Sequence, residues 1–223
     1  MKYRIIVPLY NEARYIKKFL ENMPSKHLSS LILVDDGSTD KTAKIVKENY
    51  PKTTLLQQKI NLGKGKSMET GALRAIKDKA DVLIFMDGDM QHKPTDIDRF
   101  LRAFKKQRRI DIIFGARTIG KNMRLAPFMG NKMLTIIINL FFKYFLNDTQ
   151  CGFRGFRAKV FDKVRWRSSG YAAETEMVIN AARNRLRYRE ISIDTVYLDH
   201  YKGTSIFDGV IILAKITIWK FFK

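Results

Sequence analysis

The segment VLIFMDGDMQ, residues 82–91, decides the fold: its apolar run leads directly into Asp87-Gly88-Asp89. An uninterrupted apolar run of this length predicts a strand buried on both faces of a sheet, and Gly88 permits a tight turn at its end. Two carboxylates around a glycine can present oxygens to one divalent cation, and Gln91 adds an amide oxygen. The segment therefore predicts a site for Mg²⁺ or Mn²⁺ at Asp87, Asp89 and Gln91, with a purely structural turn as the alternative.

The same pattern recurs through the first 115 residues, where short apolar runs alternate with helical stretches that have a polar face. The expected strands are 4–7, 31–34, 54–56, 82–86 and 110–114, and the expected helices are 13–22, 41–48, 67–77 and 97–106. Asp40 and Pro94-Thr95 are suited to start the second and fourth helices. This alternation is typical of a Rossmann-like α/β fold, with a mostly parallel sheet and helices on both faces. We expect a single domain over residues 1–223.

Polar clusters follow the other expected strands as well. They are Pro8-Leu9-Tyr10-Asn11-Glu12, Asp35-Asp36-Gly37-Ser38 and Asn61-Leu62-Gly63-Lys64-Gly65-Lys66. Parallel sheets bind ligands at the carboxyl ends of their strands, so we expect these clusters to share one site. The third cluster is not a P-loop, because Ile60 stands where that motif needs a glycine. Its lysines either approach a phosphate or ribose or are simply solvated.

After Gly115 the pattern changes to a basic loop (117–124) and a very apolar helix (129–145). Arg117 and Arg124 have the forked guanidinium that suits phosphate. Asp148 lies in an apolar, basic region, so its carboxylate is expected to pair with an arginine or to have a function. A helix near 174–184 and a strand near 188–193 follow. Glu174 and Glu176 near the start of that helix complement its dipole or serve the site.

The charge of the chain is unusual: 42 Lys and Arg against 22 Asp and Glu give a net charge of +20. Residues 1–100 carry 18 basic and 13 acidic side chains, and residues 101–223 carry 24 and 9, so most of the excess lies in the second half. Such an excess predicts a polyanionic partner, namely nucleic acid, an anionic membrane or a phosphorylated substrate. No nucleic-acid module is legible, which argues against the first. The single cysteine, Cys151, and the lack of a signal-peptide pattern favour a cytoplasmic protein.

Together, these clusters resemble family 2 glycosyltransferases with the GT-A fold. One subgroup of this family glycosylates polyprenyl or dolichyl phosphate and includes the dolichol-phosphate mannose and glucose synthases. The segment that resembles this subgroup is Asp148-Thr149-Gln150-Cys151-Gly152-Phe153-Arg154. One departure is His92-Lys93-Pro94 in place of the more usual His-Pro-Pro. The resemblance implies an inverting transfer of a hexose from a UDP- or GDP-linked sugar to a lipid phosphate at the membrane surface.

The resemblance also implies roles for individual residues. Pro8, Tyr10, Glu12 and Asp36 would line the base and ribose pocket of the nucleotide sugar. Lys64 is a further expected nucleotide contact, on the ground of its glycine-rich loop and not of the resemblance. Asp87 would contact the nucleotide and the metal, with Asp89 and Gln91 completing the metal site. Arg117 and Arg124 would hold the acceptor phosphate or the donor diphosphate. Asp148 would be the candidate catalytic carboxylate, and Asp89 and Arg117 are the other candidates for a catalytic role. Residues 1–115 would be the nucleotide-sugar half and residues 116–204 the acceptor half.

Residues 205–223 form the third expected region, an amphipathic C-terminal helix. Its apolar residues are interleaved with Lys215, Lys220 and Lys223, a pattern that suits a membrane interface. Packing on the core and contact with a second subunit remain alternatives for the same pattern. Two other functions also remain open: the same fold acting on a soluble or polysaccharide acceptor, and a non-enzymatic nucleic-acid-binding protein.

Overall fold

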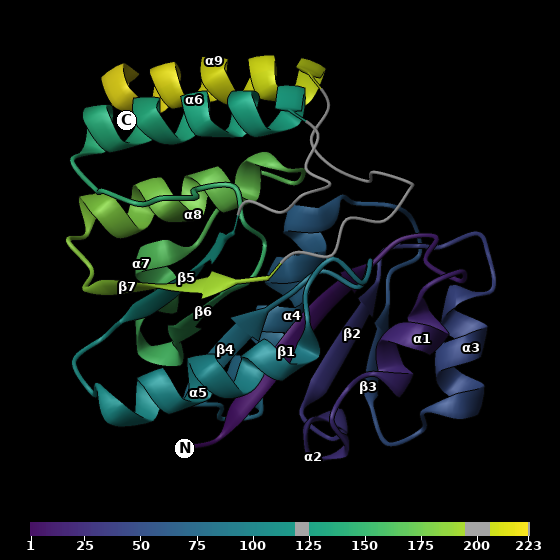
Figure 1. Ribbon diagram of the computed structural model, residues 1–223. Helices are drawn as coiled ribbons and strands as arrows, with labels where there is room; N and C mark the ends of the chain where they lie inside the picture. Colours follow the sequence, from purple (N-terminus) through teal and green to yellow (C-terminus); the bar gives the residue numbers. More distant parts are fainter. Residues whose placement is uncertain (119–124, 195–205, 223) are drawn as a thin grey trace.

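One sheet runs through the molecule, with its described strands in the order β3-β2-β1-β4-β6-β5-β7 (Figure 1). The computed structural model describes residues 1–118, 125–194 and 206–222. The strands are β1 (Tyr3–Leu9), β2 (Leu31–Asp35), β3 (Thr54–Gln57), β4 (Val82–Phe85), β5 (Ile112–Arg117), β6 (Arg154–Arg157) and β7 (Tyr188–Ile193). All pair in parallel except β6, which is antiparallel to both β4 and β5. The predicted mostly parallel α/β sheet is confirmed.

Helices cover both faces of this sheet, as the sequence predicts. Against one face lie α1 (Ile16–Glu21), α2 (Ser25–Leu28), α3 (Thr42–Asn49) and α5 (Ile97–Lys106), the last preceded by a 3₁₀ turn at Pro94–Asp96. Against the other lie α4 (Lys64–Lys77), α7 (Phe161–Val164) after the 3₁₀ turn Ala158–Val160, and α8 (Ala172–Arg183). Asp40 was expected to cap α3, but the N-cap position is Lys41; Asp40 lies one residue earlier and accepts a hydrogen bond from the N–H of Thr42, the first residue of the helix.

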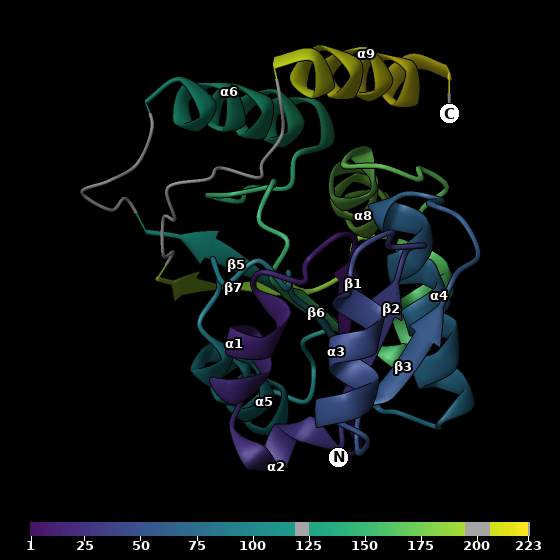
Figure 2. The same ribbon diagram turned by 90° about the vertical axis from the view of Figure 1, so that its right-hand side faces the viewer.

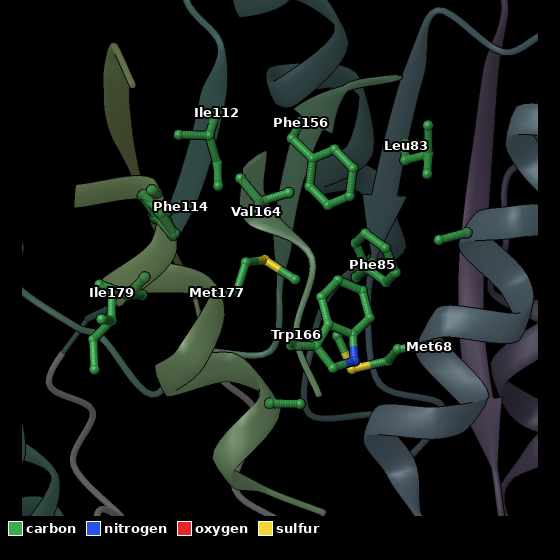
Figure 3. Close-up of a cluster of buried hydrophobic side chains, with 14 of the residues drawn as sticks. Met68, Leu83, Phe85, Ile112, Phe114, Phe156, Val164, Trp166, Met177 and Ile179 are labelled. Carbon is green, nitrogen blue, oxygen red and sulfur yellow. The ribbon is translucent and has the colours of Figure 1, made fainter. Parts of the chain in front are cut away.

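The core on the α4 and α8 side is dense in aromatic rings (Figure 3). Phe85 of β4 packs on Phe156 of β6 with ring centroids 5.3 Å apart, and edge-on against Trp166 at 5.8 Å. Such pairs add to the apolar area that the rings bury. They fix β6 and the Trp166 segment to β4, the middle strand of the sheet.

Two long helices form a further layer beyond α8 (Figures 1 and 2). These are α6 (Leu125–Phe142) and α9 (Ile206–Phe222), which pack side by side. α9 buries Ile212, Ile216 and Trp219 against the rest of the molecule, so packing on the core is confirmed for this helix. No helix within the described ranges is both long enough and apolar enough to cross a bilayer.

The main difference from the sequence prediction is β6. Its residues, Arg154-Gly155-Phe156-Arg157, contain two arginines and a glycine and give no apolar run, so sequence patterns do not predict a strand there. The strand forms because β4 and β5 supply backbone partners on both sides. The short helices α2 and α7 were likewise not predicted, since each is only four residues long.

The close packing of α4 on the sheet gives a first prediction. A Cβ at Gly71 would overlap Ile6 and lie 3.2 Å from Cγ2 of Val34, whereas one at Gly130 in α6 would meet nothing within 4 Å. We expect Gly71→Ala to lower the free energy of unfolding by about 1–3 kcal/mol, because overpacking outweighs the gain in helix propensity. Gly130→Ala should raise it by up to about 1 kcal/mol. Urea unfolding of both variants measures this, and a stabilised Gly71→Ala protein would contradict the packing.

Candidate functional site

A cavity of about 420 Å³ lies at the carboxyl ends of β1, β2 and β4. The residues that line it are Pro8, Leu9, Tyr10, Glu12, Asp36, Asn61, Gly63, Lys64, Asp87, Gly88, Asp89, Gly170 and Tyr171. Six residues that the sequence predicts to contact the nucleotide line this cavity: Pro8, Tyr10, Glu12, Asp36, Lys64 and Asp87. We call this hollow the first cavity.

Asp36 has a structural task in the first cavity. Its two carboxylate oxygens accept hydrogen bonds from the backbone N–H groups of Leu62 and Gly63, both at 2.9 Å. These bonds hold the loop before α4 against the end of β2. Each oxygen has a second lone pair, so this role is compatible with contact to a ligand.

The second half of the chain also contributes to the first cavity, through the loop before α8. The N–H of Gly65 donates to the carbonyl of Ser169 at 2.5 Å, and Trp166 Nε1 donates to the carbonyl of Gly65 at 2.8 Å. A Cβ at Gly63 would lie 2.5 Å from the Ser169 carbonyl oxygen, so the two loops are in close contact. This contact brings Tyr171 to the cavity wall.

Lys64 connects two acidic residues at the first cavity. Its Nζ lies 2.7 Å from Asp87 Oδ1 and 2.7 Å from Glu174 Oε1, and 5.7 Å from the ring centre of Tyr171. Burial disfavours the charged amine, but the two carboxylates outweigh burial and raise the pKa of Lys64. Lys64 is therefore a fixed cation that balances part of the acidic charge.

Asp89 and Gln91 form the other part of the predicted metal site. Asp89 accepts hydrogen bonds from the backbone N–H of Gln91 at 3.0 Å and from Gln91 Nε2 at 2.8 Å. Burial, together with the charge of Asp87, raises the pKa of Asp89 to about 7. A divalent cation would relieve this repulsion, so the carboxylates fit a metal ion.

The protein side of this metal site is small. In the described part of the chain, no group of three or more His, Cys, Asp or Glu side chains could hold a metal ion. Mg²⁺ and Mn²⁺ sites of this kind complete their shell with water and phosphate oxygens. The arrangement therefore suits an ion that is shared with a phosphorylated ligand.

Asp148 was expected to pair with an arginine or to have a function, and the structure shows that it pairs with Arg117. Arg117 Nε donates to Asp148 Oδ2 at 2.6 Å and Nη2 donates to Oδ1 at 3.0 Å, while the backbone N–H of Gln150 donates to Oδ1 at 3.0 Å. Burial alone would raise the pKa of Asp148, but Arg117 outweighs it and the pKa is lowered. A carboxylate held in this way is a weak base and a good anchor for the guanidinium.

The Arg117–Asp148 pair lines a second cavity of about 360 Å³, beside α6. Its lining residues are Arg117, Thr118, Phe128, Asn131, Lys132, Thr135, Asn147 and Asp148. Two cations and several amide and hydroxyl groups face one carboxylate that is already paired. This composition suits an anionic group such as a phosphate. Arg124, the other predicted phosphate contact, lies outside the described residues.

The two cavities lie at the same edge of the sheet, the first beyond β4 and the second beyond β5. A Cβ at Gly152 would lie 2.5 Å from Asp87 Oδ2, so the loop that begins at Asp148 passes directly against the carboxylate of the first cavity. This loop therefore connects Asp148 of the second cavity with Asp87 of the first.

Sequence patterns missed the cavity residues that long-range packing supplies. Tyr171 and Gly170 of the first cavity, and Asn131, Lys132 and Thr135 of the second, were not predicted. The polar residues of α6 gave the available signal, since they interrupt an otherwise apolar helix.

The chain is similar to known proteins in sequence. The family model described as Glycosyl transferase family 2 matches residues 4–165. UDP-N-acetylglucosamine–dolichyl-phosphate N-acetylglucosaminyltransferase of Methanococcus voltae is 29% identical, over 98% of this chain and 96% of its own. Undecaprenyl-phosphate mannosyltransferase of Micrococcus luteus is 25% identical, over 98% of this chain and 94% of its own.

A solved structure confirms the fold. Glucosyl-3-phosphoglycerate synthase from Mycobacterium tuberculosis, in complex with Mn²⁺, UDP-glucose and glycerol 3-phosphate, superposes with a TM-score of 0.77. The match covers 98% of this chain and 79% of that chain at 14% identity. The expected GT-A architecture is therefore confirmed.

The central position of Lys64 gives a second prediction. Lys64→Met leaves Asp87 and Glu174 without their shared cation, so we expect the free energy of unfolding at neutral pH to fall by about 2 kcal/mol. Lys66→Met is the matched control, because Glu69 keeps its ion pair with Arg165 at 2.7 Å. That control should lose less than about 0.5 kcal/mol. Equal losses in urea unfolding of the two variants would contradict the role given to Lys64.

Proposed function

The chain belongs to glycosyl transferase family 2, and from this premise we propose that it transfers a hexose or N-acetylhexosamine from a nucleotide sugar to polyprenyl or dolichyl phosphate at a membrane surface. The nucleotide sugar would bind in the first cavity and the acceptor phosphate in the second. Both the Methanococcus voltae and the Micrococcus luteus relatives are named for transfer to a polyprenyl-type phosphate, and each match covers nearly the whole chain.

One observation carries this proposal: a single loop connects an acidic cavity of metal-binding type with a cation-lined cavity, because it begins at Asp148 of the second cavity and its Gly152 contacts Asp87 of the first. A metal-bound diphosphate suits the first and a phosphate monoester suits the second. A sugar would pass from one to the other along this loop.

α6 supports a lipid acceptor in particular. The second cavity is lined on this side by Phe128, Asn131, Lys132 and Thr135. Other residues of the same helix expose large apolar side chains to solvent. Met129, Met133, Ile136 and Leu140 are between 50% and 67% exposed. A phosphate in the cavity would therefore have an apolar helix surface beside it for a hydrocarbon chain.

We propose that Asp87, Asp89 and Gln91 hold Mg²⁺ or Mn²⁺ when the donor binds. The Mycobacterium tuberculosis structure of the same fold contains Mn²⁺ together with UDP-glucose. Such an ion would supply positive charge to the diphosphate leaving group. Lys64 would keep Asp87 ionised and in place.

The proposed reaction is a single displacement with inversion. An oxygen of the acceptor phosphate attacks the anomeric carbon of the sugar, and the bond from that carbon to the diphosphate oxygen breaks. A phosphate is already an anionic nucleophile at neutral pH, so no strong general base is needed. Arg117 would hold the phosphate, and Asp148 would act by fixing the orientation of Arg117.

A panel of donors and acceptors tests this function. The purified chain is incubated with UDP- and GDP-linked sugars, with Mg²⁺, Mn²⁺ or EDTA, and with a polyprenyl phosphate in detergent. We expect a lipid-linked sugar product from at least one donor, and none in EDTA. No product from any donor would overturn the proposal.

A soluble acceptor is the second candidate, because the second cavity is also large enough for a small phosphorylated molecule. Glucosyl-3-phosphoglycerate synthase, which has the same fold, has been solved in complex with phosphoglyceric acid. The panel therefore includes 3-phosphoglycerate and a polysaccharide. Product with one of these and none with polyprenyl phosphate would replace the lipid acceptor by a soluble one.

Asp148→Asn gives a third prediction. An amide binds the guanidinium fork of Arg117 less strongly than a carboxylate, so Arg117 loses its fixed orientation. We expect kcat to fall at least about tenfold while the Kd for the donor changes less than about threefold, since the pair lies in the acceptor cavity.

Asp111→Asn is the matched control for this prediction. Asp111 pairs with Arg187 at 3.2 Å, beside the opposite end of β5. Its substitution should leave kcat within about twofold of the unchanged protein, because the pair is far from both cavities. Asp148→Asn turnover equal to that of the control would contradict the role of Asp148.

We propose that the molecule meets the membrane through the outer face of α6 and α9, which pack side by side (Figure 1). Val210, Ile218 and Phe221 of α9 continue the exposed apolar surface of α6, at 51% to 68% exposure. Lys132, Lys143, Lys215 and Lys220 lie on or next to these helices. Apolar side chains with lysines at their margins suit the interface of an anionic bilayer.

Flotation with anionic vesicles tests this surface and is the fourth prediction. The unchanged protein should float at low salt and less at high salt, because the lysine contribution is screened. The double substitution Leu140→Glu and Phe221→Glu should reduce flotation by at least about fivefold. Leu73→Glu on α4, where the side chain is 45% exposed, should not. Unchanged flotation of the double variant would exclude this surface as the contact.

A further inference from the structure

Arg154, the first residue of β6, is the largest fully buried side chain among the described residues, with 0% exposure. Its guanidinium donates to backbone carbonyls: Nη1 to Glu174 at 2.7 Å, Nε to Cys151 at 3.1 Å, Nη2 also to Cys151, and Nη2 to Thr149 at 3.4 Å. The ring of Phe114 lies 5.6 Å from its central carbon.

None of these partners is a carboxylate, so Arg154 is a buried cation held by neutral groups. Glu174 gives its carbonyl to Arg154 and its carboxylate to Lys64. Burying a cation without a carboxylate partner costs free energy. A neutral side chain with N–H groups could also donate hydrogen bonds to these carbonyls, so the bonds alone do not require a positive charge. We therefore looked to the positive charge of Arg154, and not to its hydrogen bonds, for a function.

Arg154 stands between the two cavities. In the sheet it is opposite Phe85 of β4, two residues before Asp87, and opposite Phe114 of β5, three residues before Arg117. The antiparallel direction of β6 puts this first residue at the carboxyl edge of the parallel strands. Burial lowers the pKa of Arg154, and the charges of Glu174, Asp148 and Asp87 oppose that shift, so its cation interacts with acidic groups of both cavities.

The charge matters because the ligands of the proposed function are anions and the edge itself is acidic. The first cavity is lined by four acidic residues: Glu12, Asp36, Asp87 and Asp89. Within the described residues, its lining contains one lysine, Lys64. A diphosphate approaching this edge meets several carboxylates. A buried cation beneath the edge attracts the anion without touching it, and low-dielectric surroundings screen that attraction weakly.

We propose that Arg154 is an electrostatic positioning residue. Its positive charge, buried beneath the sheet edge between the first and second cavities, raises the affinity of that edge for anionic ligands. This inference rests on the proposed function, since it takes nucleotide and lipid phosphates as the ligands. Its effect should grow with the negative charge of the ligand and vanish for an uncharged one.

Nucleotide binding by the full chain in EDTA tests this inference, because EDTA removes the contribution of any divalent cation. The ligands are uridine, UMP and UDP, and the corresponding guanosine series. In Arg154→Met, we expect the Kd for the nucleoside diphosphate to rise about tenfold and the Kd for the monophosphate by less. The Kd for the neutral nucleoside should change less than about twofold.

Two further variants separate charge from loop geometry. Arg154→Lys keeps the charge and loses the fork to the three carbonyls, so it should melt at a lower temperature and still bind the diphosphate within about threefold of the unchanged protein. Arg157→Met is the matched control. Arg157 ends the same strand, donates to the carbonyls of Ile110, Phe104 and Gln107, and lies 5.3 Å from the ring centre of Phe104. That variant should leave all nucleotide affinities unchanged.

Equal losses for nucleoside and diphosphate in Arg154→Met would overturn the inference, because they would indicate a displaced loop. Unchanged diphosphate affinity would overturn it as well. If Arg154→Met does not fold, Arg154→Lys decides: a tenfold loss of diphosphate binding in that folded variant contradicts a role for the charge. Failure of the unchanged protein to bind any nucleotide would instead contradict the proposed function.

Discussion

The reversed direction of β6 is the constraint on which the site depends. β6 pairs antiparallel with β4 and β5, so it enters the sheet at the edge where those parallel strands leave it. The loop from Asp148 to Gly152 is thereby brought to the same edge as Asp87, and Gly152 is in contact with that carboxylate. A parallel strand at this position would begin at the opposite edge and would need a crossover connection to reach it. One antiparallel strand therefore brings the loop of the second cavity to the carboxylate of the first.

The charge of the chain divides into two kinds with different physical meaning. The net charge of +20 arises mostly from side chains beyond residue 100, and many of these are exposed lysines and arginines that salt can screen. Lys64, Arg117 and Arg154 are different, because each is held at or beneath the acidic edge by several short contacts. Their fields act in surroundings of low dielectric. The surface excess accordingly suits long-range attraction to a membrane, and the three held cations suit the recognition of phosphate.

Local patterns in the sequence were sufficient for the first half of the site. Asp87 and Asp89 directly follow an apolar run, and the carboxyl ends of parallel strands meet at one edge of a sheet. The place of these carboxylates therefore follows from the hydrophobic pattern and from the order of the strands in the sequence. The pairing of Arg117 with Asp148 could only be suspected, because 31 residues separate the two side chains. Tyr171 was not predicted, since it reaches the first cavity through contacts of the Trp166–Ser169 segment with Gly65, about a hundred residues away. β6 was missed because its neighbours, and not its own residues, make it a strand.

α6 resolves a difficulty that the proposed substrates create. A nucleotide sugar comes from water, whereas a polyprenyl phosphate stays in a bilayer, and both must reach one point. Lys132 and Thr135 of α6 line the second cavity, while Met133 and Ile136 of the same two turns are exposed on its outer surface. An α-helix with its side chains is about 10–12 Å across, which is within reach of a lipid headgroup and the first units of its chain. With the outer face of α6 on the bilayer, the acceptor phosphate would enter the second cavity while its hydrocarbon chain stays in the lipid. The first cavity is lined by the ends of β1, β2 and β4 and would stay open to the nucleotide sugar from water.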